Sequence, residues 1–309
     1  MILVCGEALL DVFATAETRT GLTLDANVGG SPFNVAVGLA RLGQPVGFFS
    51  AISTGFAGER LMRALIAEGV STQAVVRVDA PTTIALVGLD AHGVPSYAFY
   101  GAGGADRLLP REALAQLPHT LSAINVGSYA SVVEPVASTL RALVARERGR
   151  ALIAFDPNVR LNVEPDIGRW REQFTWMLPR ADLLKISEED LALLQPEVEL
   201  DDFAAHVVRL GVRTVVVTRG ALGAIAWTAA GARATVGPVT VPVIDSVGAG
   251  DTFQAALLTW LAENGALSAT ALDSLADSAL RDALGFAARA AAITCSRRGA
   301  DMPTRAALR

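Results

Sequence analysis

The stretch Asp245-Ser246-Val247-Gly248-Ala249-Gly250-Asp251-Thr252-Phe253 lies between two segments with different hydrophobic patterns. The preceding run, 239–244, is apolar and rich in β-branched residues, which predicts a strand. After the stretch, apolar residues recur at helical spacing, which predicts a helix with one buried face. These apolar residues are Phe253, Ala256, Leu257, Trp260 and Leu261. The pattern therefore predicts that a glycine turn joins a strand to a helix.

Such a turn is suited to binding an anion. Gly248 and Gly250 have no side chain that would keep a ligand away from the backbone. The free amides of a helix N-terminus, together with the helix dipole, attract negative charge. Asp251 would add one carboxylate to the same turn. The simpler alternative is that Asp251 only caps the helix, as Asp residues near helix starts often do.

The bulk properties favour a globular α/β protein and give no sign of a nucleic-acid or membrane partner. The chain has 309 residues, of which 51% are hydrophobic, and a net charge of -5. It contains no basic stretch, and its apolar runs are well short of the roughly 18 residues of a membrane span. Met1 leads directly into an apolar segment without the features of a signal peptide. We expect a soluble, cytoplasmic protein.

The first third of the chain mixes strands with two helices. The expected elements are a strand at 2–6, weak strands within 11–28, a helix from about 29 to 42, a strand at 45–49, a helix at 58–68, and strands at 82–90 and 95–100. The last two strands flank a glycine-containing turn at 91–94, which predicts a hairpin. Together with 11–28, this hairpin could form a small antiparallel sheet.

From about residue 121, apolar strands alternate with amphipathic helices. The expected strands are 122–126, 151–155, 182–186 and 214–218, and the expected helices are 132–147, 168–178, 188–194, 202–210 and 268–296. This alternation predicts a mostly parallel central sheet covered by helices on both faces. Residues 222–236 predict one antiparallel hairpin on that sheet. We expect a single α/β domain over residues 1–309.

Polar residues follow several of the predicted strands. They are Asp11, the run 156–160, Lys185, the run 218–220 and Asp245. Any one of them could be a solvated loop residue or a helix cap. Because ligands of open parallel sheets bind at the carboxyl ends of the strands, five such positions together predict a ligand site. Asn34, one turn into the first helix, either lies on the surface or faces the mouth of that pocket.

Several familiar nucleotide and hydrolase motifs are absent from the sequence. It contains no G-x-x-x-x-G-K-[ST], no G-x-G-x-x-G after the first strand, and no G-x-S-x-G. These absences argue against a P-loop protein, a dinucleotide-binding fold and an α/β hydrolase.

Two long motifs carry a family resemblance. Residues 245–258 (DSVGAGDTFQAALL) resemble the C-terminal signature of the ribokinase/fructokinase (PfkB-type) carbohydrate kinases, and residues 29–36 (GGSPFNVA), followed by 39–43 (LARLG), resemble their N-terminal signature. The resemblance covers nearly the whole chain. It implies a ribokinase-like α/β fold with a small β-sheet lid, formed here by about 11–28 and 82–101, and it implies ATP and Mg2+ as cofactors.

The resemblance also implies roles for individual residues. Asp251 would take the proton from the acceptor hydroxyl, and the amides of Gly248, Ala249 and Gly250 would stabilise the transferring phosphoryl group. The sugar-binding residues would be Asp11, Gly29, Gly30, Asn34, Phe99 and Arg160. The nucleotide-binding residues would be Lys185, Thr218, Gly220 and Gly223, with the base near the helix at 287–292. Asp245 resembles a position that in some members helps to hold a monovalent cation such as K+.

Two segments depart from the family pattern. Where the family often has Asn-x-x-Glu near the metal, this chain has Ser187-Glu188-Glu189-Asp190, which also fits a helix capping box. Where many members carry an acidic pair before Phe and Gly, this chain has Thr54-Gly55.

The sequence predicts an ATP-dependent sugar kinase, with fructose as the preferred acceptor. The closest alternative is a 2-keto-3-deoxygluconate kinase, in which Arg160, with Arg107, would face the substrate carboxylate. Ribokinase and nucleoside kinase activities are further alternatives, and a non-catalytic sugar-binding relative is a different class. Apolar lid residues could pair with a second copy in a homodimer or only close over the substrate; these are Val12, Phe13, Ile84 and Leu86.

Overall fold

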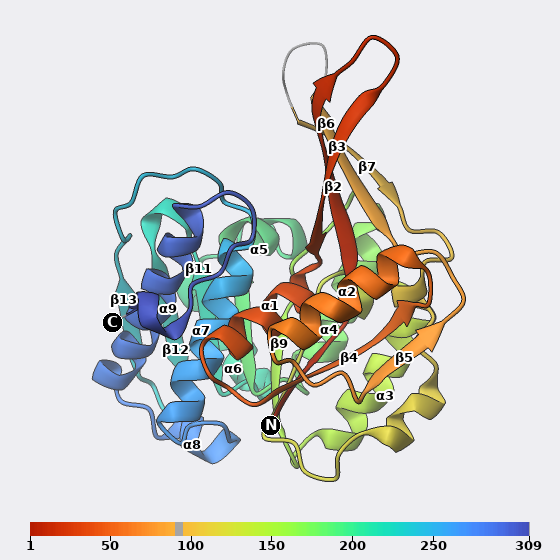
Figure 1. Cartoon of the computed structure of the whole chain (residues 1–309). Helices are drawn as coiled ribbons and strands as arrows, with labels where there is room; N and C mark the ends of the chain where they lie inside the picture. The colour runs from red at the N-terminus through yellow and green to blue at the C-terminus, as the bar shows by residue number, and fades with distance from the viewer. Residues whose placement is uncertain (90–94, 309) are drawn as a thin grey trace.

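The computed structural model describes residues 1–89 and 95–308. It contains a nine-stranded sheet flanked by helices and a four-stranded sheet that projects from the main body (Figure 1). The predicted α/β fold class is therefore confirmed. The predicted turn at 91–94, with His92, lies outside the described residues.

The main sheet has the strand order β13-β12-β11-β10-β9-β8-β1-β4-β5. In chain order these strands are β1 (Ile2–Cys5), β4 (Val46–Ser53), β5 (Val75–Val78), β8 (Ala123–Gly127), β9 (Leu152–Asp156), β10 (Leu183–Ser187), β11 (Thr214–Thr218), β12 (Ala224–Thr228) and β13 (Arg233–Val236). Neighbours from β5 to β11 pair in parallel, and β12 and β13 form the predicted antiparallel hairpin. β1, β4, β8 and β9 are buried along their whole length, which explains their continuous apolar runs.

Two helical layers cover the sheet. The helices are α1 (Ser31–Arg41), α2 (Phe56–Ala67), α3 (Val136–Glu147), α4 (Ile167–Met177), α5 (Glu188–Leu194), α6 (Leu200–Leu210), α7 (Ala249–Glu263), α8 (Ala269–Asp273) and α9 (Asp277–Cys295). Helices α3 to α6 share one apolar core with the sheet, and α1, α2 and α7 to α9 share the other. β1 serves both cores, because Leu3 and Cys5 face the first and Ile2 and Val4 face the second. In the described ranges, no helix has the length and apolarity needed to cross a membrane.

The small sheet has the order β3-β2-β6-β7 and consists of β2 (Leu9–Glu17), β3 (Leu22–Gly29), β6 (Ile84–Leu89) and β7 (Pro95–Tyr100). Two antiparallel hairpins, β2/β3 and β6/β7, join through a parallel pair between β2 and β6. The expectation of a purely antiparallel sheet is thus wrong at this central pair. β2 and β6 both leave the main body in the same direction, so they lie parallel (Figure 1).

The strand predicted before the glycine turn is wrong. Residues 239–244, which all belong to the described part of the chain, form a loop and lie in no sheet. Pro238 and Pro242 cannot donate to a ladder, and Val243 and Ile244 are 71% and 65% exposed. The Ile244 amide donates instead to the Cys295 carbonyl at the end of α9, at 2.8 Å. Asp245 therefore follows a loop and not a strand.

The backbone at Gly223 gives a stability prediction. Gly223 has φ +86°, and an added Cβ would lie 2.0 Å from the Val236 carbonyl oxygen. Gly231 has a similar φ, +92°, but nothing lies within 4 Å of an added Cβ. Gly223→Ala should therefore lower the free energy of unfolding by about 3 kcal/mol, and Gly231→Ala by about 1 kcal/mol. Denaturant unfolding of both variants measures the difference, and equal losses would contradict the clash at Gly223.

Candidate active site

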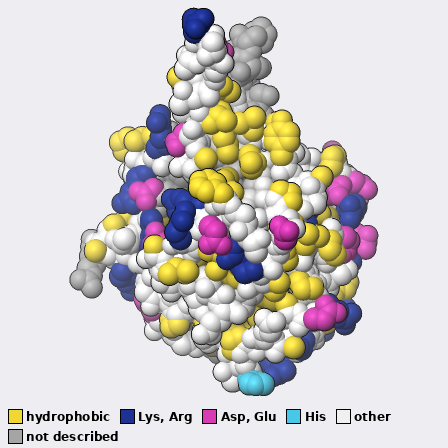
Figure 2. All heavy atoms as spheres, turned by 45° about the vertical axis from the view of Figure 1, so that its right-hand side comes forward, with side chains coloured by type: hydrophobic (Ala, Val, Ile, Leu, Met, Phe, Trp, Pro, Cys, Tyr) yellow, Lys and Arg dark blue, Asp and Glu magenta, His cyan; other side chains and the backbone are white. Residues whose placement is uncertain are grey.

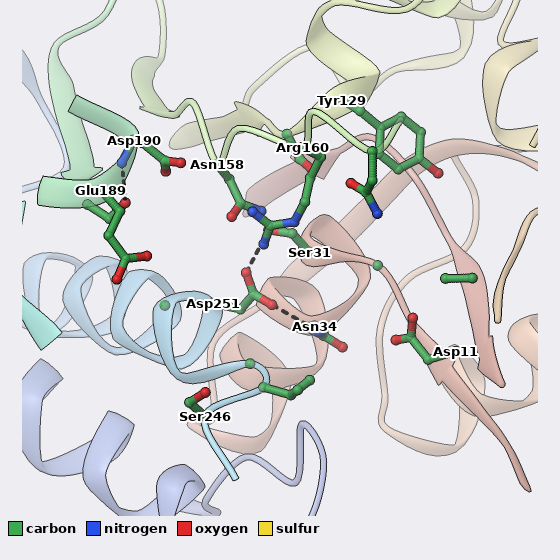
Figure 3. A pocket seen from close by; sticks show the side chains of 18 of the residues that line it. Asp11, Ser31, Asn34, Tyr129, Asn158, Arg160, Glu189, Asp190, Ser246 and Asp251 are labelled. Carbon is green, nitrogen blue, oxygen red and sulfur yellow. Dashed lines mark hydrogen bonds between the residues drawn. The ribbon is translucent and has the colours of Figure 1, made fainter. Parts of the chain in front are cut away.

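A cavity of about 820 Å³ lies where the carboxyl ends of the main-sheet strands meet the base of the small sheet. Its lining includes residues just after β8 and β9, the ends of β10 and β11, and the first turns of α1 and α7 (Figure 3). This is the edge at which open parallel sheets bind ligands.

Asp251 lies in the first turn of α7 and is 8% exposed. Its Oδ1 accepts a hydrogen bond from Ser31 Oγ at 2.6 Å, and its Oδ2 accepts one from Asn34 Nδ2 at 2.9 Å (Figure 3). The N-cap position of α7 is held by Gly248 and not by Asp251. The interpretation of Asp251 as a simple helix cap is therefore wrong, and Asn34 faces the cavity.

The glycine turn brings Gly248 and Gly250 to the cavity, whereas the Ala249 amide donates to the Ser246 carbonyl at 3.2 Å. Gly248 has φ +77°, and an added Cβ would lie 2.6 Å from Ala300 Cβ. An added Cβ at Gly250 would lie 3.3 Å from Lys185 Nζ, so the turn runs directly over this ammonium group. Free amides, a helix dipole and a lysine therefore meet at one place, which is suited to a phosphate.

Lys185 is 4% exposed and forms an ion pair with Asp156, with 2.7 Å between Nζ and Oδ2. Burial raises the pKa of the Asp156 carboxyl to about 6, and the Lys185 ammonium opposes that rise. The predicted nucleotide residue Lys185 thus also neutralises a buried carboxylate beside the turn.

Asp11 lies within β2 of the small sheet, at the start of the segment predicted to form the lid. An added Cβ at Gly29 would lie 2.1 Å from Asp11 Oδ2, so only glycine leaves room for this carboxylate. Burial, and then the charge of Asp251, raise the pKa of Asp11 to about 6, while Arg160 lowers it. The electrostatic coupling indicates that Asp11, Asp251 and Arg160 act on one another across the cavity.

An aromatic pair supports the other side of the cavity. The Phe99 and Tyr129 rings meet edge to face, with 5.5 Å between their centroids, and both line the cavity. The Arg107 guanidinium lies over both rings, at 5.8 and 5.9 Å, and does not belong to the lining formed by the described residues. Asp106 accepts hydrogen bonds from the Tyr129 hydroxyl, at 2.8 Å, and from Thr83. This network joins the base of the small sheet to the residue after β8.

Most of the sequence-predicted site residues line the cavity. They are Gly248, Gly250, Asp251, Asp11, Gly30, Asn34, Phe99, Arg160, Lys185, Thr218 and Gly220. The other four predicted residues are absent from the lining formed by the described residues: Gly29, Gly223, Asp245 and Ala249. The close contacts given above explain why positions 29 and 223 need glycine. Ala249 is the first residue of α7.

Asp245 connects two loops. Its Oδ1 accepts from the Val247 amide at 3.0 Å, and its Oδ2 accepts from the Gly299 amide at 2.8 Å.

Ser187 is the N-cap of α5 and accepts from the Asp190 amide. The Asp190 carboxylate accepts from the Val159 amide in the loop after β9. The Ser187 half of the predicted capping box is confirmed, and Asp190 also holds the 156–160 loop.

Sequence reasoning missed several lining residues, among them Glu7, Ser31 and Ser128. Ser128 has φ +52°, an uncommon backbone conformation for a residue other than glycine. Glu7 is 1% exposed, and its Oε2 has no hydrogen-bond partner within the described ranges. Only Ser31 carried a usable signal, because it lies three residues before Asn34 and therefore on the same helical face.

The profile of the family described as pfkB family carbohydrate kinase matches residues 1–307. The chain belongs to this family. It is 36% identical to a fructokinase from Rhizobium leguminosarum bv. trifolii over 282 residues, which cover 91% of this chain and 86% of that one. It is 32% identical to probable fructokinase-4 of Arabidopsis thaliana over 312 residues, which cover 97% and 92%.

Solved structures of this family share the fold. An ATP-bound fructokinase from Xylella fastidiosa superposes with a TM-score of 0.88 at 27% identity, covering 99% of this chain and 96% of that one. A fructokinase double mutant from Vibrio cholerae O395, bound to fructose, ADP and a potassium ion, gives 0.84 at 25% identity, with 99% and 96% covered. The chain is thus a carbohydrate kinase with a ribokinase-like fold.

Glu7 predicts how stability depends on pH. Burial raises the pKa of the Glu7 carboxyl from 4.5 to about 8, so the folded state keeps a proton that the unfolded state releases. The stability contributed by this proton is complete below pH 4.5 and is lost as the pH rises to about 8. The free energy of unfolding of Glu7→Gln should therefore fall less steeply than that of the wild type between pH 5 and 8.

Denaturant unfolding at pH 5, 6.5 and 8 measures these slopes. Glu172→Gln is the matched control, because the Glu172 side chain is 73% exposed. It should keep the wild-type slope. A Glu7→Gln slope equal to that of the wild type would show that Glu7 is already ionised in the folded protein at neutral pH.

Proposed function

We propose that this carbohydrate kinase is an ATP-dependent fructokinase, which transfers the γ-phosphoryl group of ATP to a hydroxyl of fructose. The observation that carries the proposal is the position of the Asp251 carboxylate. It faces the cavity, hydrogen-bonded to α1, one turn from the free amides of the Gly248–Gly250 turn. The similarity to fructokinases across nearly the whole chain supports fructose as the acceptor.

Asp251 is the catalytic base in this mechanism. Each of its oxygens accepts one hydrogen bond from α1, and a carboxylate oxygen has a second acceptor site that remains for the substrate hydroxyl. The transition state of phosphoryl transfer is loose, so the base orients the hydroxyl and accepts its proton late. The hydroxyl oxygen bonds to the γ-phosphorus as the bond to the ADP oxygen breaks, and the proton passes to Asp251.

The glycine turn stabilises the transferring group. The amides of Gly248 and Gly250 lie at the start of α7, and Lys185 adds a positive charge beside Gly250. The predicted contribution of the Ala249 amide is wrong, because this amide donates to the Ser246 carbonyl at 3.2 Å. These groups are held by the fold before the reaction, so they need no reorganisation when negative charge develops.

The sugar occupies the part of the cavity below the small sheet. Asp11, Gly30 and Asn34 bind its hydroxyls, Phe99 covers its apolar face, and Arg160 reaches the sugar or the phosphates. The small sheet acts as a lid on a single kinase domain that spans residues 1–309. Gly29 contributes by admitting the Asp11 carboxylate.

The nucleotide lies along Lys185, Thr218 and Gly220, and Gly223 shapes the 219–223 loop by accepting from the Arg219 amide at 2.8 Å. Glu189 and Asp190 line the cavity and would hold Mg2+, which needs only one or two protein carboxylates and would neutralise the phosphate charge (Figure 3). Asp245 would help to hold a monovalent cation such as K+.

The small sheet also provides a surface for a homodimer. β3 is an edge strand, and its Leu22 and Leu24 are 52% and 49% exposed. Figure 2 shows the small sheet standing out from the body, with apolar side chains gathered around its base. We propose that β3 pairs with a second copy of the chain, which sedimentation of the purified protein would reveal as a dimer.

The acceptor is tested by measuring ADP formation with ATP, Mg2+ and a panel of fructose, ribose, 2-keto-3-deoxygluconate and adenosine. Fructose should give the highest kcat/KM. Tight fructose binding without turnover of any acceptor would contradict the assignment as a kinase acting on these substrates.

Asp251→Asn should bind fructose with nearly the wild-type Kd, because an amide retains the shape and one acceptor of the carboxylate. Its kcat should fall by about 10² to 10⁴-fold, the usual contribution of a general base. Calorimetry measures the binding and ADP release the turnover. Near-normal turnover would refute the role of Asp251 as base.

Arg160→Ala separates fructose from the acidic alternative. A fructose site uses Arg160 for hydrogen bonding, whereas a carboxylate substrate needs its charge. We expect Arg160→Ala to reduce kcat/KM for 2-keto-3-deoxygluconate more than for fructose. If fructose is turned over poorly and the acidic sugar well in the wild type, the acidic sugar is the substrate.

A further inference from the structure

Ser31 and Asn34 together hold both oxygens of one carboxylate. They lie three residues apart on α1, so their side chains share a face of the helix. Ser31 donates to Asp251 Oδ1 at 2.6 Å, and Asn34 donates to Oδ2 at 2.9 Å. With one donor on each oxygen, the plane of the carboxylate is fixed. Asn34 alone would leave the carboxylate free to turn about its own axis.

The chain sets the position of Ser31 by close backbone contacts. Gly30 precedes it with φ +104°, and an added Cβ there would lie 2.9 Å from the Glu7 carbonyl oxygen. Pro32 follows it in the first turn of α1, where a missing amide proton costs no hydrogen bond. An added Cβ at Gly6 would lie 2.6 Å from Pro32 Cγ. Ser31 is therefore anchored from both sides.

The opposite partner is equally fixed. An added Cβ at Gly38 of α1 would lie 2.8 Å from Ala255 Cβ of α7, so the two helices pack very closely. The separation between Ser31 and Asp251 follows from this packing and not from a flexible loop. A hydroxyl donor held at 2.6 Å from a carboxylate oxygen forms a short, charge-assisted hydrogen bond.

Ser31 also acts against the charges around Asp251. Asp11 from β2 and Arg160 from the loop after β9 lie on the same side of the cavity as this carboxylate (Figure 3). Lys185 from β10 lies beside Gly250, paired with Asp156 from β9. Asp11 and Asp156 repel the Asp251 carboxylate, because its charge raises the pKa values of both groups. The Ser31 hydroxyl binds the carboxylate without adding a charge to the site.

We propose that Ser31 is a positioning residue for phosphoryl transfer, which orients the Asp251 carboxylate toward the acceptor hydroxyl. This inference rests on the proposed role of Asp251 as the base. Ser31 acts through Asp251, so its loss affects the chemical step more than sugar binding.

Three variants test the inference. Ser31→Ala should lower kcat roughly 10- to 100-fold, the range expected for a lost hydrogen bond to a charged group. The fructose KM should change by less than about threefold, because the lost interaction matters mainly in the transition state. Ser31→Thr, which keeps the hydroxyl, should restore most of kcat.

Ser268→Ala is the matched control. Ser268 caps α8 and lies outside the cavity, so this change also removes a hydroxyl at a helix start. It should leave kcat unchanged. Fructose binding and thermal unfolding of each variant, measured alongside, report whether the variant is folded.

The outcomes separate this inference from the proposed function. If Asp251→Asn is inactive and folded Ser31→Ala has the wild-type kcat, the base assignment stands and the role of Ser31 is refuted. If Ser31→Ala loses kcat and fructose binding together, and Ser31→Thr does not recover them, Ser31 is only structural. If Asp251→Asn retains turnover, the proposed function fails first.

Discussion

The close contact between α1 and α7 is the constraint on which the site depends. Gly38 and Ala255 face each other where no larger side chain fits, so the two helices approach more closely than helices with bulky side chains can. Their N-terminal turns consequently reach the same cavity. Asp251 from one helix meets Ser31 and Asn34 from the other, and the free amides of α7 open beside them. Small residues between the two helices thus determine the geometry of the polar groups in the cavity at the carboxyl ends of the strands.

The charges of the cavity are balanced in pairs. The charge of Asp156 is neutralised by Lys185. Asp251 raises the pKa of the Asp11 carboxyl, and Arg160 lowers it. Burial raises the pKa values of Asp11 and Asp156 only to about 6, so both carry mostly negative charge at neutral pH. A phosphate donor adds further negative charge. Lys185 and the glycine turn at the start of α7, which lie beside each other, provide positive charge and helix dipole for it.

The small sheet is fixed at its base. Asp106, which is 1% exposed, accepts hydrogen bonds from Thr83, just before β6, and from Tyr129, just after β8. Tyr129 in turn packs against Phe99 of β7. The residues that connect the two sheets therefore also support the aromatic side of the cavity. The strands beyond this base are more exposed, above all β3.

Hydrophobic periodicity in the sequence was enough to predict the alternation of strands and helices from β8 to β12, because a strand buried on both faces must be apolar throughout. The two glycine motifs were enough to predict the family and the residues of the anion turn. The strand predicted at 239–244 was wrong, because its apolar residues lie in an exposed loop beside two prolines, and periodicity alone does not report burial.

Only the tertiary structure decided which partners each polar residue has. Ser31 and Asn34 are 220 and 217 positions away from Asp251 in the sequence, and no local pattern encodes such contacts. The same holds for Lys185 with Asp156, for Gly29 with Asp11 and for Gly223 with Val236. The sequence by itself determined that Asp251 stands at the start of a helix after a glycine turn. Whether it caps that helix or faces a cavity depended on the neighbouring helix, since a carboxylate bonds to whichever donors the packing brings within reach.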